Sequence, residues 1–148
     1  TCALPILPLK IELKPGEKFI VNGAVMVAGK SGASLALKNR AVLLRGRDVM
    51  QETEATTPAR RLYFTLMLMY IDPENRAAHA QSFAAFLNDY LGATTLASTR
   101  AKLEKIAAVA MSDEFYAGLK LCKELIALED SLLNPKGAAP AARTATRP

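Results

Sequence analysis

One stretch decides the fold, and it runs Leu13-Lys14-Pro15-Gly16-Glu17-Lys18-Phe19-Ile20-Val21-Asn22-Gly23-Ala24-Val25. Pro15-Gly16 predicts a turn, because proline fixes φ and glycine accepts a positive φ. Asn22-Gly23 lies between two apolar runs and predicts a two-residue hairpin, since a type I′ turn needs a positive φ at both residues. The stretch therefore predicts short antiparallel strands joined by tight turns.

The flanking residues extend this β pattern. Apolar and charged residues alternate over residues 9–14, which is typical of a half-buried strand. After a loop at 28–32, the segments 34–38 and 41–45 predict a second hairpin across Asn39-Arg40. Five short strands thus predict a small antiparallel β-meander, barrel-like in character, within residues 1–54.

Helical signals begin in the stretch Ala55-Thr56-Thr57-Pro58-Ala59-Arg60-Arg61-Leu62-Tyr63-Phe64. Thr57 suits an N-cap and Pro58 the first helical position. The helix that follows is apolar on nearly every side, so we expect it at the centre of the fold. Three further helices are predicted, starting near Asp72-Pro73, near residue 96 and at Ser112-Asp113-Glu114. The sequence therefore predicts an α+β fold, with a four-helix unit over residues 55–135 and a disordered tail over 136–148.

The composition excludes several classes of protein. An apolar fraction of 51% and a mean hydropathy of +0.12 are those of a folded chain of 148 residues, not of a disordered one. No apolar run reaches the length of a membrane helix, and the first residues lack the features of a signal peptide. Two cysteines cannot form a disulfide framework, so we expect a cytoplasmic protein with Cys122 in its core.

Catalytic and metal-binding groups are scarce. His79 is the single histidine, and with no cysteine pair the sequence predicts neither a metal nor another cofactor. Gly29-Lys30-Ser31 does not complete a phosphate-binding loop, because five residues rather than four separate Gly23 from Gly29. No nucleophile is paired with a base. We therefore expect a protein that is not an enzyme.

Charge is distributed unevenly along the chain. Residues 1–61 hold ten Lys and Arg against five Asp and Glu, whereas residues 62–148 hold nine of each. The net charge of +5 thus lies in the first part and favours an anionic partner there, with a solvated basic face as the alternative. The candidate residues for contact with this anionic partner are Lys38, Arg40, Arg45, Arg47, Arg60 and Arg61. The last two begin a helix, where the dipole disfavours cations, so an internal pair with Glu52 or Glu54 is an alternative role for them.

Taken together, the two stretches quoted above resemble the FlbT family of flagellum biosynthesis repressors. Two later segments strengthen the likeness, Met69-Tyr70-Ile71-Asp72-Pro73-Glu74-Asn75 and Phe115-Tyr116-Ala117-Gly118-Leu119-Lys120. The resemblance covers roughly residues 9–130. It implies a post-transcriptional regulator that binds the 5′ untranslated region of flagellin mRNA and represses translation or alters mRNA stability, with FlaF as a functional partner. Residues 14–27 are also similar to the start of the carbon storage regulator CsrA, a β-fold that binds mRNA.

These patterns leave other functions open. The helical unit could hold FlaF or flagellin, making the protein a chaperone or adaptor without direct RNA contact. It could instead be a structural subunit of a flagellar assembly. In the favoured interpretation, residues 1–54 bind RNA and residues 55–135 serve packing, partner binding or homo-oligomer formation. The sequence does not decide whether the protein represses or activates.

Overall fold

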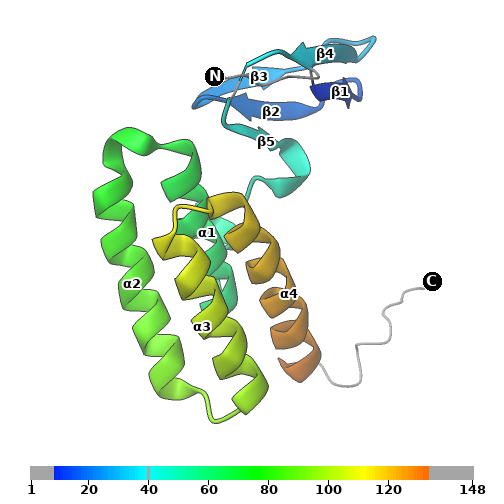
Figure 1. Ribbon diagram of the computed structural model, residues 1–148. Coiled ribbons are helices and arrows are strands. Elements are labelled where there is room, and N and C mark those ends of the chain that lie inside the picture. Colours follow the sequence, from blue (N-terminus) through cyan, green and yellow to red (C-terminus); the bar gives the residue numbers. More distant parts are fainter. Residues whose placement is uncertain (1–8, 40, 134–148) are drawn as a thin grey trace, which may run out of the picture.

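A computed structural model describes residues 9–39 and 41–133. Five strands come first: β1 (Leu9–Leu13), β2 (Lys18–Val21), β3 (Ala24–Val27), β4 (Ala33–Leu37) and β5 (Leu43–Arg45). Four helices follow: α1 (Pro58–Ile71), α2 (Arg76–Ala93), α3 (Ala97–Met111) and α4 (Phe115–Leu133). Short 3-10 helices link them: η1 (Gly46–Asp48), η2 (Glu52–Glu54) and η3 (Pro73–Asn75). The strands sit at one end of the helices, which confirms the predicted α+β fold (Figure 1).

Both predicted turns of the opening stretch are present. Asn22 and Gly23 have φ of 50° and 85°, and they join β2 to β3 with Val21 opposite Ala24. Gly16 has a φ of 73°, and the Glu17 N–H donates to the Lys14 carbonyl at 3.0 Å. Local turn chemistry therefore sets these connections, as the sequence predicted.

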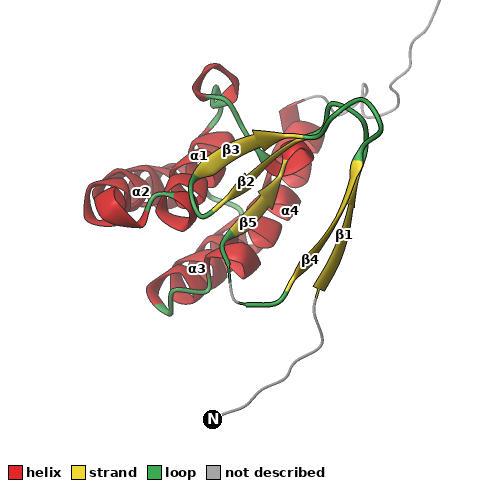
Figure 2. Ribbon diagram, turned by 90° about the horizontal axis from the view of Figure 1, so that it is seen from above, coloured by secondary structure: helices red, strands yellow, loops and turns green. Residues whose placement is uncertain are grey.

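The predicted meander and its second hairpin are wrong. β4 pairs with β1 and β5 pairs with β2, both antiparallel, so β4 and β5 lie in different sheets (Figure 2). The chain enters β5 beside the first hairpin, because Asn22 accepts from the Val42 N–H through its side chain at 2.9 Å and donates its own N–H to the Val42 carbonyl. The described strands form a two-stranded ribbon and the sheet β3-β2-β5, and they close no barrel.

The sheet β3-β2-β5 lies between the β1–β4 ribbon and the helices. Phe19 of β2 packs with Ile11 and Leu13 of the β1–β4 ribbon. The next residue, Ile20, points to the opposite face and joins Leu44 in the helical core. Alternate residues of one strand thus connect the ribbon to the helices.

Helix α1 lies at the centre of the helical unit, as its apolar sequence predicted. Leu62 and Leu66 are fully buried, and α1 packs on both α2 and α4. Thr57 accepts from the Arg60 N–H at 3.3 Å, which confirms the cap, and Cys122 of α4 is buried as expected. The described helices include none that is long and apolar enough to cross a membrane.

Two details of the helices differ from expectation. Pro73 starts η3 instead of α2, because the Asp72 carboxylate binds Asn75 and His79 and does not cap the helix. The sequence pattern aligns Leu133 with Phe115, Leu119, Cys122 and Ile126 on one stripe of the last helix, but Leu133 is 62% exposed. Leu125 and Glu129 occupy core positions of α4 instead.

Candidate nucleic-acid interface

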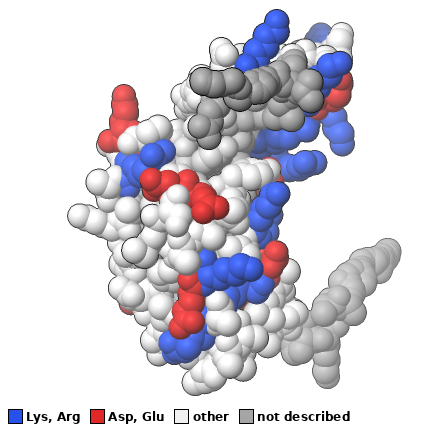
Figure 3. All heavy atoms as spheres, viewed as in Figure 1, with Lys and Arg blue, Asp and Glu red and all other residues white. Residues whose placement is uncertain are grey.

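A basic hollow of about 420 Å³ lies where the turn after β1 meets the end of β5. Its lining consists of Lys14, Gly16, Glu17, Lys18, Arg45, Gly46 and Arg47. The pairing of β2 with β5 builds it, since Phe19 is opposite Arg45 and Lys18 therefore lies next to Gly46. On the face shown in Figure 3, Lys and Arg side chains gather at the strand end of the molecule and along one side below it. We call these seven residues the basic hollow.

Arg45 is held in place inside the hollow. Its Nε and Nη2 donate to the two carboxylate oxygens of Glu17, both at 3.0 Å, and Nη2 also donates to the Glu12 carbonyl. The hydrogen bond from Arg45, followed by the one from the Lys14 N–H, lowers the pKa of Glu17; the same pair raises the pKa of Arg45. This ion pair neutralises Arg45 and fixes the turn against β5.

The charge left in the hollow belongs to Lys14, Lys18 and Arg47. All three are exposed, and among residues 9–39 and 41–133 none has an acidic partner within 4 Å. Lysine offers a mobile point charge, and arginine a planar fork that can bind phosphate through two N–H groups. The hollow is therefore equipped to bind an anion.

The basic surface continues onto α4. Lys123 pairs with Asp48, the residue after Arg47, so α4 adjoins the hollow. Lys120 lies one turn earlier, with its Nζ 5.2 Å from the centre of the Tyr116 ring. Tyr116 is 44% exposed and packs on Tyr70. The Tyr70 hydroxyl donates to the carbonyl of Leu43, the first residue of β5, and Arg45 is the last residue of the same strand. Cations and one exposed aromatic ring thus follow one side of the molecule.

The predicted candidate residues do not form one cluster. Arg45 and Arg47 lie together in the hollow. Lys38 follows β4 at the opposite end of the ribbon, because Leu13 pairs with Ala33 and Leu9 with Leu37. A ribbon of this length separates the two ends by about 13 Å. Arg40 lies outside the described residues.

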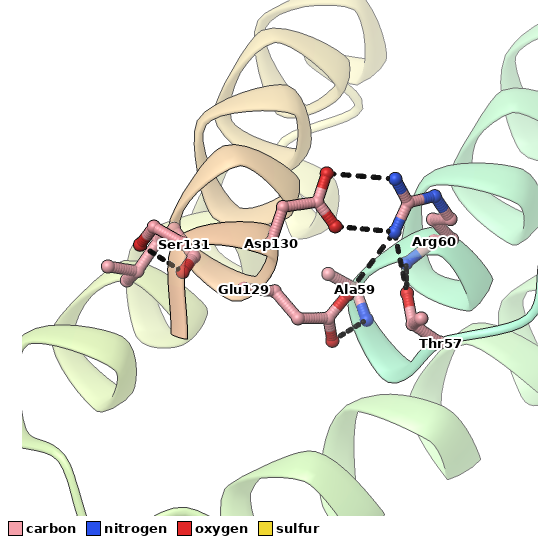
Figure 4. Close-up of polar contacts among 7 residues, drawn as sticks. Thr57, Ala59, Arg60, Glu129, Asp130 and Ser131 are labelled. Atoms are coloured by element: carbon pink, nitrogen blue, oxygen red, sulfur yellow. Dashed lines mark hydrogen bonds and ion pairs between the residues drawn. The ribbon is translucent and has the colours of Figure 1, made fainter. Parts of the chain in front are cut away.

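Arg60 and Arg61 lie at the end of α1 that points away from the strands. Arg60 donates to both oxygens of Asp130 at 2.9 Å and lies 3.8 Å from Glu129 (Figure 4). Its role is therefore an internal ion pair, with a partner on α4 and not Glu52 or Glu54. Arg61 is exposed beside Glu52 and His79.

Glu129 provides a hydrogen-bond acceptor for a backbone N–H group at the start of α1. It is 6% exposed, and its carboxylate accepts from the Ala59 N–H at 3.0 Å (Figure 4). The first N–H groups of a helix have no partner within the helix, and the positive end of the helix dipole attracts a carboxylate. The end of α4 thus caps α1 and holds Arg60 in the same contact.

Sequence reasoning missed Lys14, Lys18, Lys120 and Lys123. In the alternating strand pattern Lys14 shares a face with Glu12, which dilutes its charge, whereas in the structure the turn carries Lys14 into the hollow. The available signal was the run Lys-Pro-Gly-Glu-Lys, which gathers two lysines on one tight turn. The two α4 lysines join the surface only through tertiary packing, which no local pattern records.

A second hollow, apolar and about 580 Å³, lies between α2 and α3. Small side chains such as Ala80, Ala84 and Ala107 line it together with Phe83 and Leu87. Arg76 and Asp113 mark its charged end, where the Arg76 guanidinium lies 4.8 Å from the centre of the Phe115 ring. We call this the α2–α3 groove. No cluster suited to a metal ion occurs in the described part of the chain.

The fold and the hollow define a small α+β protein with a basic surface on its β unit. The family model of the flagellar protein FlbT matches residues 9–133, so the chain belongs to the FlbT family. It is 42% identical to a probable flagellum biosynthesis repressor protein FlbT of Caulobacter sp. (strain K31), over 86% of this chain and 97% of that protein. The corresponding Agrobacterium fabrum protein is 32% identical over 90% of this chain and 89% of its own length. No solved structure matches significantly.

Proposed function

We propose that this chain is a non-enzymatic, cytoplasmic regulator of flagellum biosynthesis that binds the leader of flagellin mRNA directly. Relatives named flagellum biosynthesis repressors support the regulatory role. The observation that carries direct RNA contact is the group of three exposed cations, Lys14, Lys18 and Arg47, around a hollow whose fourth cation is already paired.

Each part of this surface has a role in the proposal. Lys14, Lys18 and Arg47 bind phosphates, which supply much of the affinity for nucleic acid. Lys120 extends the track along α4. Tyr116 offers a ring face for an unpaired base, because single-stranded RNA is recognised largely by stacking and by contacts to splayed bases. Arg45 is a positioning residue, since Glu17 occupies its guanidinium.

The test is a titration of the protein with a flagellin leader transcript at several salt concentrations. Affinity should fall with salt, with a logarithmic slope of about −0.7 for each phosphate contact to a single strand. Replacing Lys14, Lys18 and Arg47 with Ala should weaken binding and flatten the slope by about 2. The single change Lys14→Ala should flatten the slope by about 0.7. Its matched control is Lys105→Ala, which removes one exposed charge from α3.

Two results would contradict this proposal. Unchanged binding by the triple variant would remove the hollow as the RNA site. Absence of leader binding at low salt, with folding verified by circular dichroism, would remove direct RNA contact altogether.

The α2–α3 groove favours a second candidate function, that of an adaptor that holds a helix of FlaF. Alanines on both walls allow an incoming helix to approach closely, and Phe83 and Leu87 offer apolar contact. Ala84 is exposed in this groove, so Ala84→Arg should abolish co-purification with FlaF while leaving leader binding intact. FlaF binding that survives this change would exclude the groove.

A further inference from the structure

Strand β3 exposes a continuous apolar run at the rim of its sheet. Val25, Met26 and Val27 are 67%, 47% and 61% exposed, although the paired residues Phe19 and Ile20 of β2 are buried. β3 is an edge strand in the order β3-β2-β5. Three neighbouring exposed apolar residues on an open strand edge are a feature that monomeric proteins normally avoid.

Neither neighbouring layer reaches this strand. Met26 lies opposite Phe19 and shares its ribbon-facing side, whereas Val25 lies opposite Ile20 and shares its helix-facing side. Both faces of β3 are therefore exposed, although the residues of β2 that pair with them are buried on both faces. Within the sheet β3-β2-β5, Figure 1 shows β5 nearest the helices and β3 farthest from them, so the open edge points away from the helical unit.

Among the described residues, the outer backbone edge of β3 has no partner strand. The two-residue turn makes Val21 and Ala24 a hydrogen-bonded pair, so the groups of Ala24 and Met26 point to β2. The N–H and C=O groups of Val25 and Val27 alternate with these and point outward. The strand also lacks the charged residues and prolines with which edge strands usually prevent pairing.

We propose that β3 pairs antiparallel with β3 of a second copy of this chain, about a two-fold axis at Met26. In this register Met26 lies opposite Met26 of the second copy, and Val25 lies opposite Val27 of the second copy. The outward groups of the two valines then form four hydrogen bonds, and every exposed apolar side chain meets another on the same face.

The strand fits its own copy because a single register both matches the side-chain faces and pairs the outward backbone groups. A two-fold axis perpendicular to the sheet places residues of equal orientation opposite each other, and the same alignment brings the outward backbone groups together. The uncharged strand brings no like charges to the axis. The outcome is a six-stranded sheet, β5-β2-β3-β3-β2-β5, with the two helical units on separate sides of the axis. This dimer does not depend on the proposed RNA contact.

Cysteine cross-linking tests the register. In a Cys2→Ser background, Met26→Cys should form a disulfide-linked dimer under mild oxidation, because residues opposite each other at a non-hydrogen-bonded position lie about 4.5 Å apart at Cα. Val25→Cys is the matched control: its two copies are diagonal, with Cα atoms about 7–8 Å apart, too far for a disulfide. Cys122 is fully buried and does not interfere.

Sedimentation velocity of the full chain at micromolar concentration tests the association itself. The unaltered protein should be a dimer, and Val27→Lys should convert it to a monomer with the same helical circular dichroism. Met111→Lys, at an 86% exposed residue of α3, should leave the dimer intact. A monomeric unaltered protein, or equal cross-linking at positions 25 and 26, would overturn the proposal.

Discussion

The buried side chain of Glu129 contributes to the stability of the fold through two contacts with the start of α1. It accepts from the Ala59 N–H and lies 3.8 Å from the Arg60 guanidinium, so its removal leaves a buried donor without a partner. We expect Glu129→Ala to lower the free energy of unfolding by about 1–3 kcal/mol, the usual cost of such a donor. Urea denaturation followed by circular dichroism measures this.

The neighbouring carboxylate provides the control. Asp130 makes two short hydrogen bonds to Arg60, but its side chain is 46% exposed. Exposed ion pairs contribute about 0–1 kcal/mol, so Asp130→Ala should cost clearly less than Glu129→Ala. Equal losses from the two variants would contradict the capping role given to Glu129.

Glu17 gives the stability of the protein a defined dependence on pH. Because its pKa is lowered from the ordinary value of 4.5, chiefly by the hydrogen bond from Arg45, its contribution is present above that value. The contribution is lost as the pH falls through the lowered pKa. Below pH 4.5 the unfolding free energy of the unaltered protein should therefore fall more steeply than that of Glu17→Gln. Urea denaturation at a series of pH values measures both slopes, and Glu74→Gln, at an exposed site, should behave like the unaltered protein.

At the scale of elements, the loop between β3 and β4 depends on Gly32. This residue has a φ of 75°, and a Cβ atom there would lie 2.5 Å from the Leu13 carbonyl oxygen. Gly32→Ala should therefore destabilise the protein by about 1–3 kcal/mol and loosen the β1–β4 ribbon. Gly92→Ala is the control, since it lies in α2 with open space around it and should stabilise the helix. Thermal unfolding measures the stability of both variants. An unchanged stability of Gly32→Ala would contradict this prediction.

The elements were largely predictable because their signals are local. Thr57-Pro58 marks the start of α1, and Asn22-Gly23 marks a hairpin whose two positive φ values suit these residue types. Strand pairing was not predictable in the same way. β1 pairs with β4 across the intervening hairpin, and the contact of Asn22 with Val42 that leads β5 to β2 spans 20 residues. No turn signal encodes such a pairing.

The candidate site was predicted only in part, for the same reason. The charge of residues 1–61 pointed to the β unit, and Arg45 and Arg47 do share a hollow. The contact of Arg45 with Glu17 spans 28 residues and that of Arg60 with Asp130 spans 70. Tertiary contacts therefore determine which cations are paired. They pair Arg60 with Asp130, whereas Lys14 and Lys18 have no acidic partner among the described residues.

At the scale of the whole molecule, strands β2 and β5 contribute side chains to the core of the helices. Ile20 and Leu44 pack into the helical cluster, and the Tyr63 hydroxyl donates to the Asp48 carbonyl at 2.6 Å. We expect hydrogen–deuterium exchange on the intact chain to show the β2 and α1 amides exchanging through one cooperative opening. Leu44→Ala should accelerate exchange in both elements, whereas Leu132→Ala, at a 53% exposed site, should affect neither. Acceleration confined to the strands would mean that the two units unfold independently.

The long-range cap of α1 also has a consequence during synthesis. The bond from Ala59 to Glu129 joins residues 70 positions apart, so α1 leaves the ribosome well before its cap exists. At roughly 5–20 residues per second, the delay is about 4–14 s. During this interval Leu62 and Leu66, which the finished fold buries completely, have no α4 to cover them. The rate of translation between Ala59 and Glu129 thus sets how long the nascent chain is accessible to chaperones or prone to aggregation.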